Sequence, residues 1–132
     1  EWYQNDLIIW SGSMKKPVQV DKYCYDVDIL PTISNLLGME YDSRLMVGQD
    51  ILSDSEQLVC FPNRSFISGK CIYNAVNGSV TPLTDEEVTQ EYLDQMSAVV
   101  YDKFSVSEMV LHENYYQYLD GHISFKSDEK SN

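Results

Sequence analysis

The chain has 132 residues, 43% of them hydrophobic, and its 21 acidic against nine basic side chains give a net charge of −12. This length supports one modest hydrophobic core, so a single domain is expected. An acidic surface repels phosphate backbones and anionic lipids, which disfavours binding to nucleic acid or docking on a membrane. No apolar run approaches the roughly 20 residues of a membrane span, so we expect no direct membrane insertion by this segment.

The continuous apolar run Leu7–Trp10 follows an opening without an initiator Met. Such a run is typical of a strand buried on both faces. A strand of this kind needs neighbours, so we expect either earlier strands of a larger α/β protein or self-association through this exposed core strand. Lys15 and Lys16 follow in a loop that could touch an anionic substrate, although solvated lysines are the simpler interpretation.

A helix with defined ends is predicted between Tyr25 and Gly38. Asp28 is placed to cap it, Pro31 falls in its first turn, and Gly38 can adopt the left-handed conformation that ends a helix. Five apolar residues are expected to share one buried face: Ile29, Leu30, Ile33, Leu36 and Leu37.

A small antiparallel sheet is predicted next. Gln57–Phe61, Arg64–Ser68 and Cys71–Ala75 are short segments with strand-forming residues. Asn77-Gly78 is a two-residue turn signal that returns Ser79-Val80 to the third segment.

Two closing helices are predicted after the sheet. Thr84-x-x-Glu87 is typical of a capping box, and Ser105-x-x-Glu108 of a second helix start. The buried stripe of the first helix is expected to be Val88, Tyr92, Met96, Val99 and Val100. The end of the chain is expected to dock through Tyr115, Tyr116, Tyr118 and Leu119.

The predicted fold class is therefore α/β, which becomes α+β for this chain alone. We expect one unit over residues 1–126, in which 1–56 flank a core sheet and 57–126 form the small antiparallel sheet and closing helices. Residues 127–132 are expected to be a disordered tail.

Several motifs resemble a known family. Asp28–Gly38 carries D-I-L-P-T-x-x-N-L-x-G, which resembles the helix after the last metal-binding segment in sulfatases and lipoteichoic acid synthases of the alkaline phosphatase superfamily. Leu7–Gly12 is similar to a late core strand of these enzymes, and Val47–Ser53 to their G-x-D-L-L-S segment. Phe61–Ile67 and Tyr73–Gly78 are similar to the C-terminal hairpin of the lipoteichoic acid synthase branch.

The resemblance implies the C-terminal, noncatalytic portion of an extracellular enzyme that other segments anchor to a bacterial membrane. A lipoteichoic acid synthase-like parent would transfer phosphoglycerol with a Thr nucleophile and a divalent metal, manganese or calcium. A sulfatase parent, the alternative, would hydrolyse sulfate esters. The family's ligands and nucleophile precede the strand similar to Leu7–Trp10, so we assign no catalytic, cofactor-binding or metal-binding residue. The expected partner is the remainder of the catalytic domain.

The segment Cys60-Phe61-Pro62-Asn63-Arg64 spells the C-x-P-x-R signature of sulfatases, in which Cys becomes a formylglycine nucleophile. Three observations oppose a catalytic role. Ser68-Gly69, in the place of the Thr-Gly that completes the sulfatase signature, lies one residue too near to Cys60. The pattern is that of a strand and turn, and the segment follows the family helix. We therefore expect a buried strand Cys, a turn Pro, and Arg64 paired with acids or carbonyls.

Histidine and cysteine give no metal or disulfide framework. His112 and His122 are expected at the surface. Cys24, Cys60 and Cys71 follow no C-x-x-C spacing, and two buried thiols are expected, although Cys60 and Cys71 on adjacent strands could pair.

A binding module for a glycan or a protein is the interpretation from another class of function. The chain has ten Tyr, and aromatic faces stack on sugars and anchor interfaces. Exposure of Tyr115, Tyr116 and Tyr118 favours this alternative, and their burial removes its basis.

Overall fold

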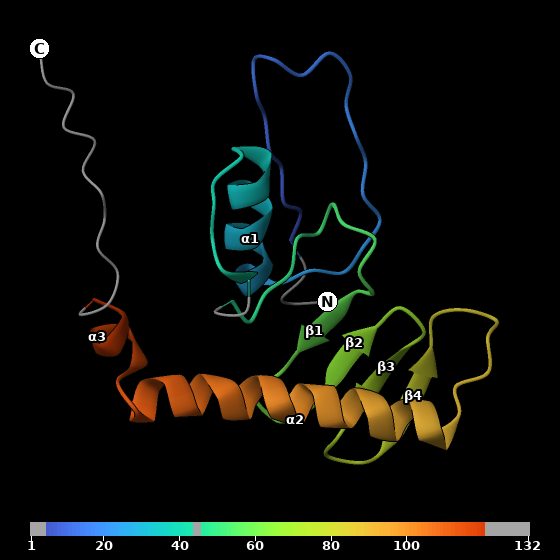
Figure 1. The fold of residues 1–132 in the computed structure, drawn as a ribbon. Coiled ribbons are helices and arrows are strands. Elements are labelled where there is room, and N and C mark those ends of the chain that lie inside the picture. Colours follow the sequence, from blue (N-terminus) through green and yellow to red (C-terminus); the bar gives the residue numbers. More distant parts are fainter. Residues whose placement is uncertain (1–4, 44–45, 121–132) are drawn as a thin grey trace, which may run out of the picture.

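The computed structural model describes residues 5–43 and 46–120 and confirms a mixed helix and sheet fold. Its helices are α1 (Asp26–Leu36), α2 (Gln90–His112) and α3 (Tyr115–Asp120). Its strands are β1 (Leu58–Cys60), β2 (Phe66–Ser68), β3 (Cys71–Asn74) and β4 (Ser79–Pro82), in one antiparallel sheet of order β1-β2-β3-β4. α2 crosses one face of the sheet and runs beyond it to α3, and α1 lies outside this layer (Figure 1). The tail predicted at 127–132 lies outside the described residues.

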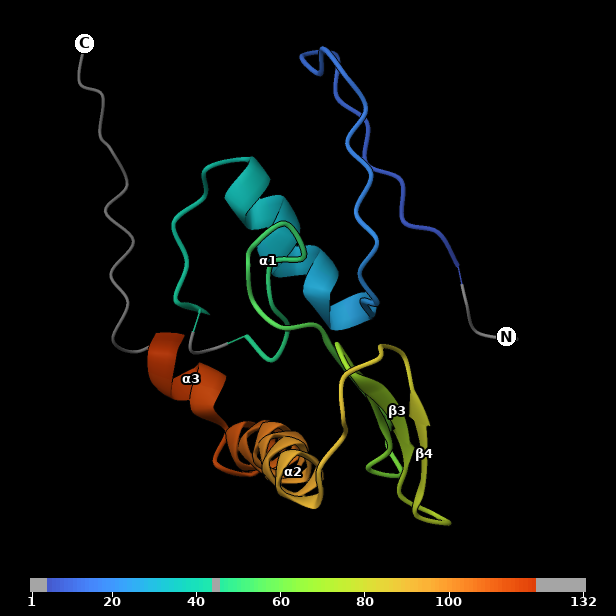
Figure 2. The same cartoon turned by 90° about the vertical axis from the view of Figure 1, so that its right-hand side faces the viewer.

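The segment before α1 differs from the expectation. Residues 5–25 run out to a tip and back without helix or strand (Figure 2), so Leu7–Trp10 does not form the predicted strand. Ile8 and Trp10 are 85% and 83% exposed. The physical reason is that a strand buried on both faces needs ladder partners, and the described residues place none beside it.

α1 begins at Asp26, so Asp28 caps the helix as predicted, but from the third helical position and not from the N-cap, which is Tyr25. The Asp28 carboxylate accepts a hydrogen bond from the Tyr25 N–H at 3.1 Å. Pro31 lies in the helix interior instead of the first turn. The predicted end is confirmed: Gly38 has φ 65°, its N–H donates to the Asn35 carbonyl, and the Met39 N–H donates to the Ser34 carbonyl.

The predicted sheet and its hairpins are confirmed. β4 returns along β3 with Ser79 opposite Asn74 and Val80 opposite Tyr73. The loop between them has four residues, 75–78, and only Gly78 has a positive φ, 70°. Asn77-Gly78 thus predicted the position of the turn correctly. The turn is not the predicted two-residue turn, because a type I′ turn needs a positive φ at both central residues.

The hydrophobic core lies between the sheet and α2. Its buried members are Leu58, Phe66, Cys71, Leu93, Met96 and Val100. Phe66 is fully buried and packs on Tyr73, with ring centroids 5.1 Å apart. Of the predicted stripe, Val99 is 43% exposed, and Leu93 takes its place in the core.

The predicted helix starts at Thr84 and Ser105 are both wrong. The Leu83 N–H still donates to the Lys70 carbonyl of the sheet region, so α2 starts later, with Thr89 accepting from the Tyr92 N–H at 3.2 Å. α2 then continues through Ser105, whose hydroxyl donates to the Tyr101 carbonyl at 3.0 Å. This bond to the preceding turn lets a serine remain inside a helix.

Candidate functional site

Two of the family-like segments, α1 and residues 47–51, pack directly against each other. Gly48 lies on the Val27 carbonyl, and a Cβ at Gly48 would be only 1.9 Å from that oxygen. Pro31 has no N–H to give the Val27 carbonyl, which lies four residues before it. The loop therefore approaches α1 where the helical ladder lacks a bond, and only glycine fits there.

Two buried side chains of α1 receive backbone N–H groups of the loop. The Gln49 N–H donates to Asp28 Oδ1 at 2.9 Å, and the Ile51 N–H donates to Thr32 Oγ1 at 3.1 Å. Asp28 is 2% exposed, and burial raises the pKa of its carboxyl, while the hydrogen bonds from Gln49 and Tyr25 oppose that rise. These contacts satisfy the buried oxygens and fix the loop on the helix.

A third polar contact completes what we call the α1–loop contact, made by Asp28, Thr32 and Asn35 with residues 48–51. Asn35 Nδ2 donates to Asp50 Oδ2 at 2.8 Å. The residues of the D-I-L-P-T-x-x-N helix and of the G-x-D segment thus bond to each other. Their polar groups are used in holding the fold.

The apolar side of α1 faces outward. Leu30 and Leu37 are 60% and 69% exposed, and Leu36 is 50% exposed. The predicted apolar face therefore exists, but its predicted burial is wrong for four of its five residues, and Ile33 is half-buried. The polar side of the helix is held by the loop instead.

A cavity of about 250 Å³ lies between the start of α1, the end of β1 and α2. Cys60 and Tyr25 both line it. Burial raises the pKa of the Cys60 thiol and of the Tyr25 hydroxyl, so both stay protonated at neutral pH. A protonated thiol is a weak nucleophile.

Lys103 of α2 closes this region and was missed in the sequence analysis. Its Nζ donates to the Val47 carbonyl at 2.5 Å, which ties α2 to the loop of the α1–loop contact. Lys103 lies three residues after buried Val100, on the stripe side of the helix. A lysine at a stripe position was the signal that could have identified it.

Arg64 contacts aromatic rings, so the prediction of acid or carbonyl partners is corrected. Its guanidinium carbon lies 4.1 Å from the Phe104 ring centroid and 5.8 Å from that of Tyr101. Its backbone has φ 68°, in the left-handed region. Arg64 thus attaches the β1–β2 turn to α2 by a cation–π contact.

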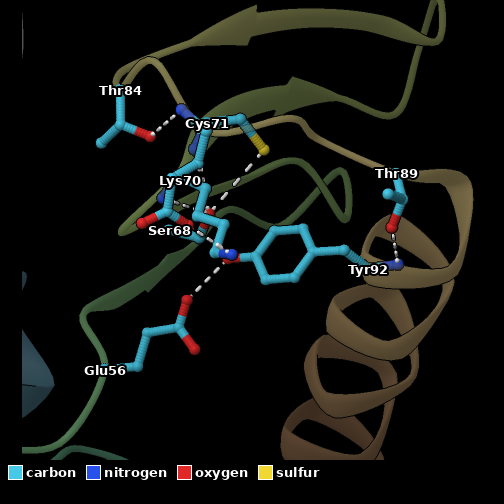
Figure 3. Close-up of polar contacts among 8 residues, drawn as sticks. Glu56, Ser68, Lys70, Cys71, Thr84, Thr89 and Tyr92 are labelled. Atoms are coloured by element: carbon cyan, nitrogen blue, oxygen red, sulfur yellow. Dashed lines mark hydrogen bonds and ion pairs between the residues drawn. The ribbon is translucent and has the colours of Figure 1, made fainter.

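A polar cluster joins the start of α2 to the sheet (Figure 3). The Tyr92 hydroxyl donates to Glu56 Oε1 at 2.6 Å, and Lys70 Nζ lies 5.3 Å from the Tyr92 ring centroid. Ser68 Oγ, fully buried, accepts from the Cys71 N–H at 3.2 Å. Burial and the bond to Glu56 raise the pKa of Tyr92 to about 12, so this phenol acts as a donor and not as a base.

Cys24, Cys60 and Cys71 are free thiols. Of the two strand cysteines that were expected to be buried, Cys71 is buried and Cys60 is half-buried. The premise that Cys60 and Cys71 lie on adjacent strands is wrong, because β2 separates β1 from β3. Two strand spacings are roughly 9.5 Å, which is too far for a disulfide.

The described residues hold no group of three or more His, Cys, Asp or Glu side chains that could bind a metal ion. His112 is exposed beside Glu113, and His122 lies outside the described part of the chain. The divalent metal expected from the resemblance therefore has no ligand set among these residues.

The tyrosines of α3 are more exposed than core packing requires. Tyr116 and Tyr118 are 56% and 59% exposed, and the rings of Tyr115 and Tyr118 stack with centroids 6.1 Å apart. The expectation that these side chains dock the chain end is wrong for Tyr116 and Tyr118.

The chain is similar in sequence to lipoteichoic acid synthases, which confirms the resemblance. It is 33% identical to lipoteichoic acid synthase 2 of Bacillus subtilis over 99 residues, or 73% of this chain. It is also 33% identical to lipoteichoic acid synthase of Staphylococcus saprophyticus over 96 residues, or 67% of this chain. The chain spans about 15% of the length of these curated relatives. No family model matches, and no solved structure matches significantly.

Proposed function

We propose that this chain is the noncatalytic C-terminal portion of an extracellular lipoteichoic acid synthase-like phosphoglycerol transferase. The observation that carries the proposal is its similarity to two lipoteichoic acid synthases over about 15% of their length. Under this proposal the Thr nucleophile and the manganese or calcium ion belong to the longer polypeptide. Sulfate-ester hydrolysis is the alternative activity of that polypeptide.

The geometry supports a structural role for the family-like residues. Asp28, Thr32 and Asn35 bond to the loop at 48–51, and Asp28 and Thr32 are buried. Cys60 is the last residue of β1, before the β1–β2 turn, and not at the start of a helix. These groups hold elements together.

Localisation follows from the same proposal. Among the described helices none is both long and apolar enough to cross a membrane. We assign membrane anchoring to segments outside this chain and place the longer polypeptide on the outer face of a bacterial membrane.

The first prediction concerns the 132-residue chain by itself. Because the proposal places nucleophile and ligands elsewhere, we expect no turnover of a chromogenic phosphodiester or a chromogenic sulfate ester with added manganese or calcium. Release of the chromophore over the no-protein blank is the measurement.

The Cys60→Ala variant serves as the control for this assay. Turnover of the sulfate ester that Cys60→Ala abolishes would show that the C-x-P-x-R segment is catalytic. That result would overturn the noncatalytic proposal and favour the sulfatase alternative.

A binding module remains the second candidate, and the exposure of Tyr116 and Tyr118 favours it. An exposed aromatic ring offers a face on which a sugar can lie. Glycan affinity that falls in a Tyr116→Ala, Tyr118→Ala double variant with unchanged melting temperature would support it. Absence of affinity for glycerol-phosphate polymers and oligosaccharides would remove this candidate.

A further inference from the structure

The outer face of α1 is an apolar surface whose outward orientation the structure explains. Ile29, Leu30, Leu36 and Leu37 are exposed on it, and Ile33 is half-buried beside them. The polar side of the helix is occupied by the α1–loop contact, where Gly48 and three hydrogen bonds hold the loop. Rolling the helix inward would break these bonds and leave the buried Asp28 and Thr32 oxygens without their donors. The chain itself therefore holds this apolar face outward.

We infer that the outer face of α1 binds an apolar surface on the polypeptide that lies outside this chain. This inference rests on the proposed function, in which the chain is one part of a longer protein. This chain matches only about 15% of the length of the relatives, so further polypeptide is available to cover the face. Burial of such a face removes apolar area from water.

Two observations favour this occupant over a second copy of the chain. Each copy carries a net charge of −12, so two copies repel each other. The 11 residues of α1 span only about 16 Å. One face of so short a helix is smaller than the roughly 800 Å² per partner that a stable complex of separate proteins buries. A tethered surface binds at a high effective concentration, so a small interface suffices within one polypeptide.

Maleimide labelling of a Leu30→Cys variant tests the inference. Leu30 is 60% exposed in this chain, so labelling should be fast in the 132-residue protein and at least tenfold slower in the longer polypeptide that contains it. Leu111→Cys is the matched control, because Leu111 is a helical leucine, 76% exposed on α2, and its labelling rate should stay the same. Peptide mass spectrometry separates these sites from the native cysteines.

A second variant avoids dependence on cysteine chemistry. Leu30→Glu should lower the melting temperature of the longer polypeptide by several degrees and leave that of the 132-residue chain within about one degree, because Leu30 loses contacts only in the former. Leu111→Glu should leave both unchanged.

Two results would overturn the inference. One is equal labelling of Leu30→Cys in both proteins. The other is protection in the 132-residue chain that grows with its concentration, because a second copy would then be the occupant. Protection in a longer polypeptide that fails to transfer phosphoglycerol would sustain the interface and refute only the proposed function.

Discussion

Replacing Gly48 with alanine is expected to cause one of the two largest losses of stability in the chain. The added Cβ would lie 1.9 Å from the Val27 carbonyl oxygen and 2.4 Å from its carbon, both backbone atoms that cannot move aside. The loop must then withdraw, and the Asp28 carboxylate loses the Gln49 N–H. Overpacking and an unsatisfied buried carboxylate together predict about 3–5 kcal/mol in the free energy of unfolding.

Urea denaturation measures this loss, and Gly12→Ala is the matched control. A Cβ at Gly12 would meet its nearest heavy atom, in the Trp10 side chain, at 3.9 Å, which is ordinary contact. Gly12→Ala should change the unfolding free energy by less than about 0.5 kcal/mol. Equal stabilities of Gly48→Ala and the unsubstituted chain would refute the α1–loop contact.

Truncation of Phe66 to alanine is the second large expected effect. Phe66 is fully buried between the sheet and α2 and packs against Tyr73. Removing its ring leaves a cavity in the core, which predicts a loss of about 3–5 kcal/mol. Denaturation followed by far-ultraviolet circular dichroism measures it.

Phe61→Ala gives the comparison for this variant, because Phe61 precedes the β1–β2 turn and is 37% exposed. Its loss should be about 1 kcal/mol or less. A Phe66→Ala protein as stable as Phe61→Ala would contradict the placement of the core between the sheet and α2.

Local signals predicted the sheet and the end of α1 because their causes are local. Gly38 can adopt φ 65° without a Cβ clash, and Asn77-Gly78 marks the turn before β4. The start of α1 was misplaced because Asp28 caps the helix from its third position and not from the N-cap. The start of α2 was misplaced because a tertiary contact decides it. Leu83 is held to Lys70 of the sheet region, which delays α2 beyond Thr84.

The apolar face of α1 shows a different limit of sequence reasoning. Periodicity identified the residues of the face, but it could not say which side of the helix this chain covers. That choice depends on residues 48–51, whose backbone N–H groups bond to Asp28 and Thr32. The strand predicted at Leu7–Trp10 fails for a related reason, because its apolar pattern requires neighbours that the described residues do not provide.

The positions of Cys60 and Arg64 were partly predictable. Their place at a strand end and in a turn followed from the pattern of Pro62-Asn63. The Arg64 contact with Phe104 did not, because it joins segments 40 residues apart. The cavity beside Cys60 likewise depends on Lys103 of α2.

The central claim is that this chain is a noncatalytic part of a phosphoglycerol transferase, and turnover by the longer polypeptide tests it most directly. Transfer of phosphoglycerol from a lipid donor would be measured for the unsubstituted polypeptide and for Cys60→Ala and Arg64→Ala variants, each with its melting temperature. The account predicts transfer by all three, with both variants within a few-fold of the unsubstituted protein once folded. A roughly hundredfold loss at an unchanged melting temperature would contradict it, because such a loss is typical of a group that stabilises the transition state.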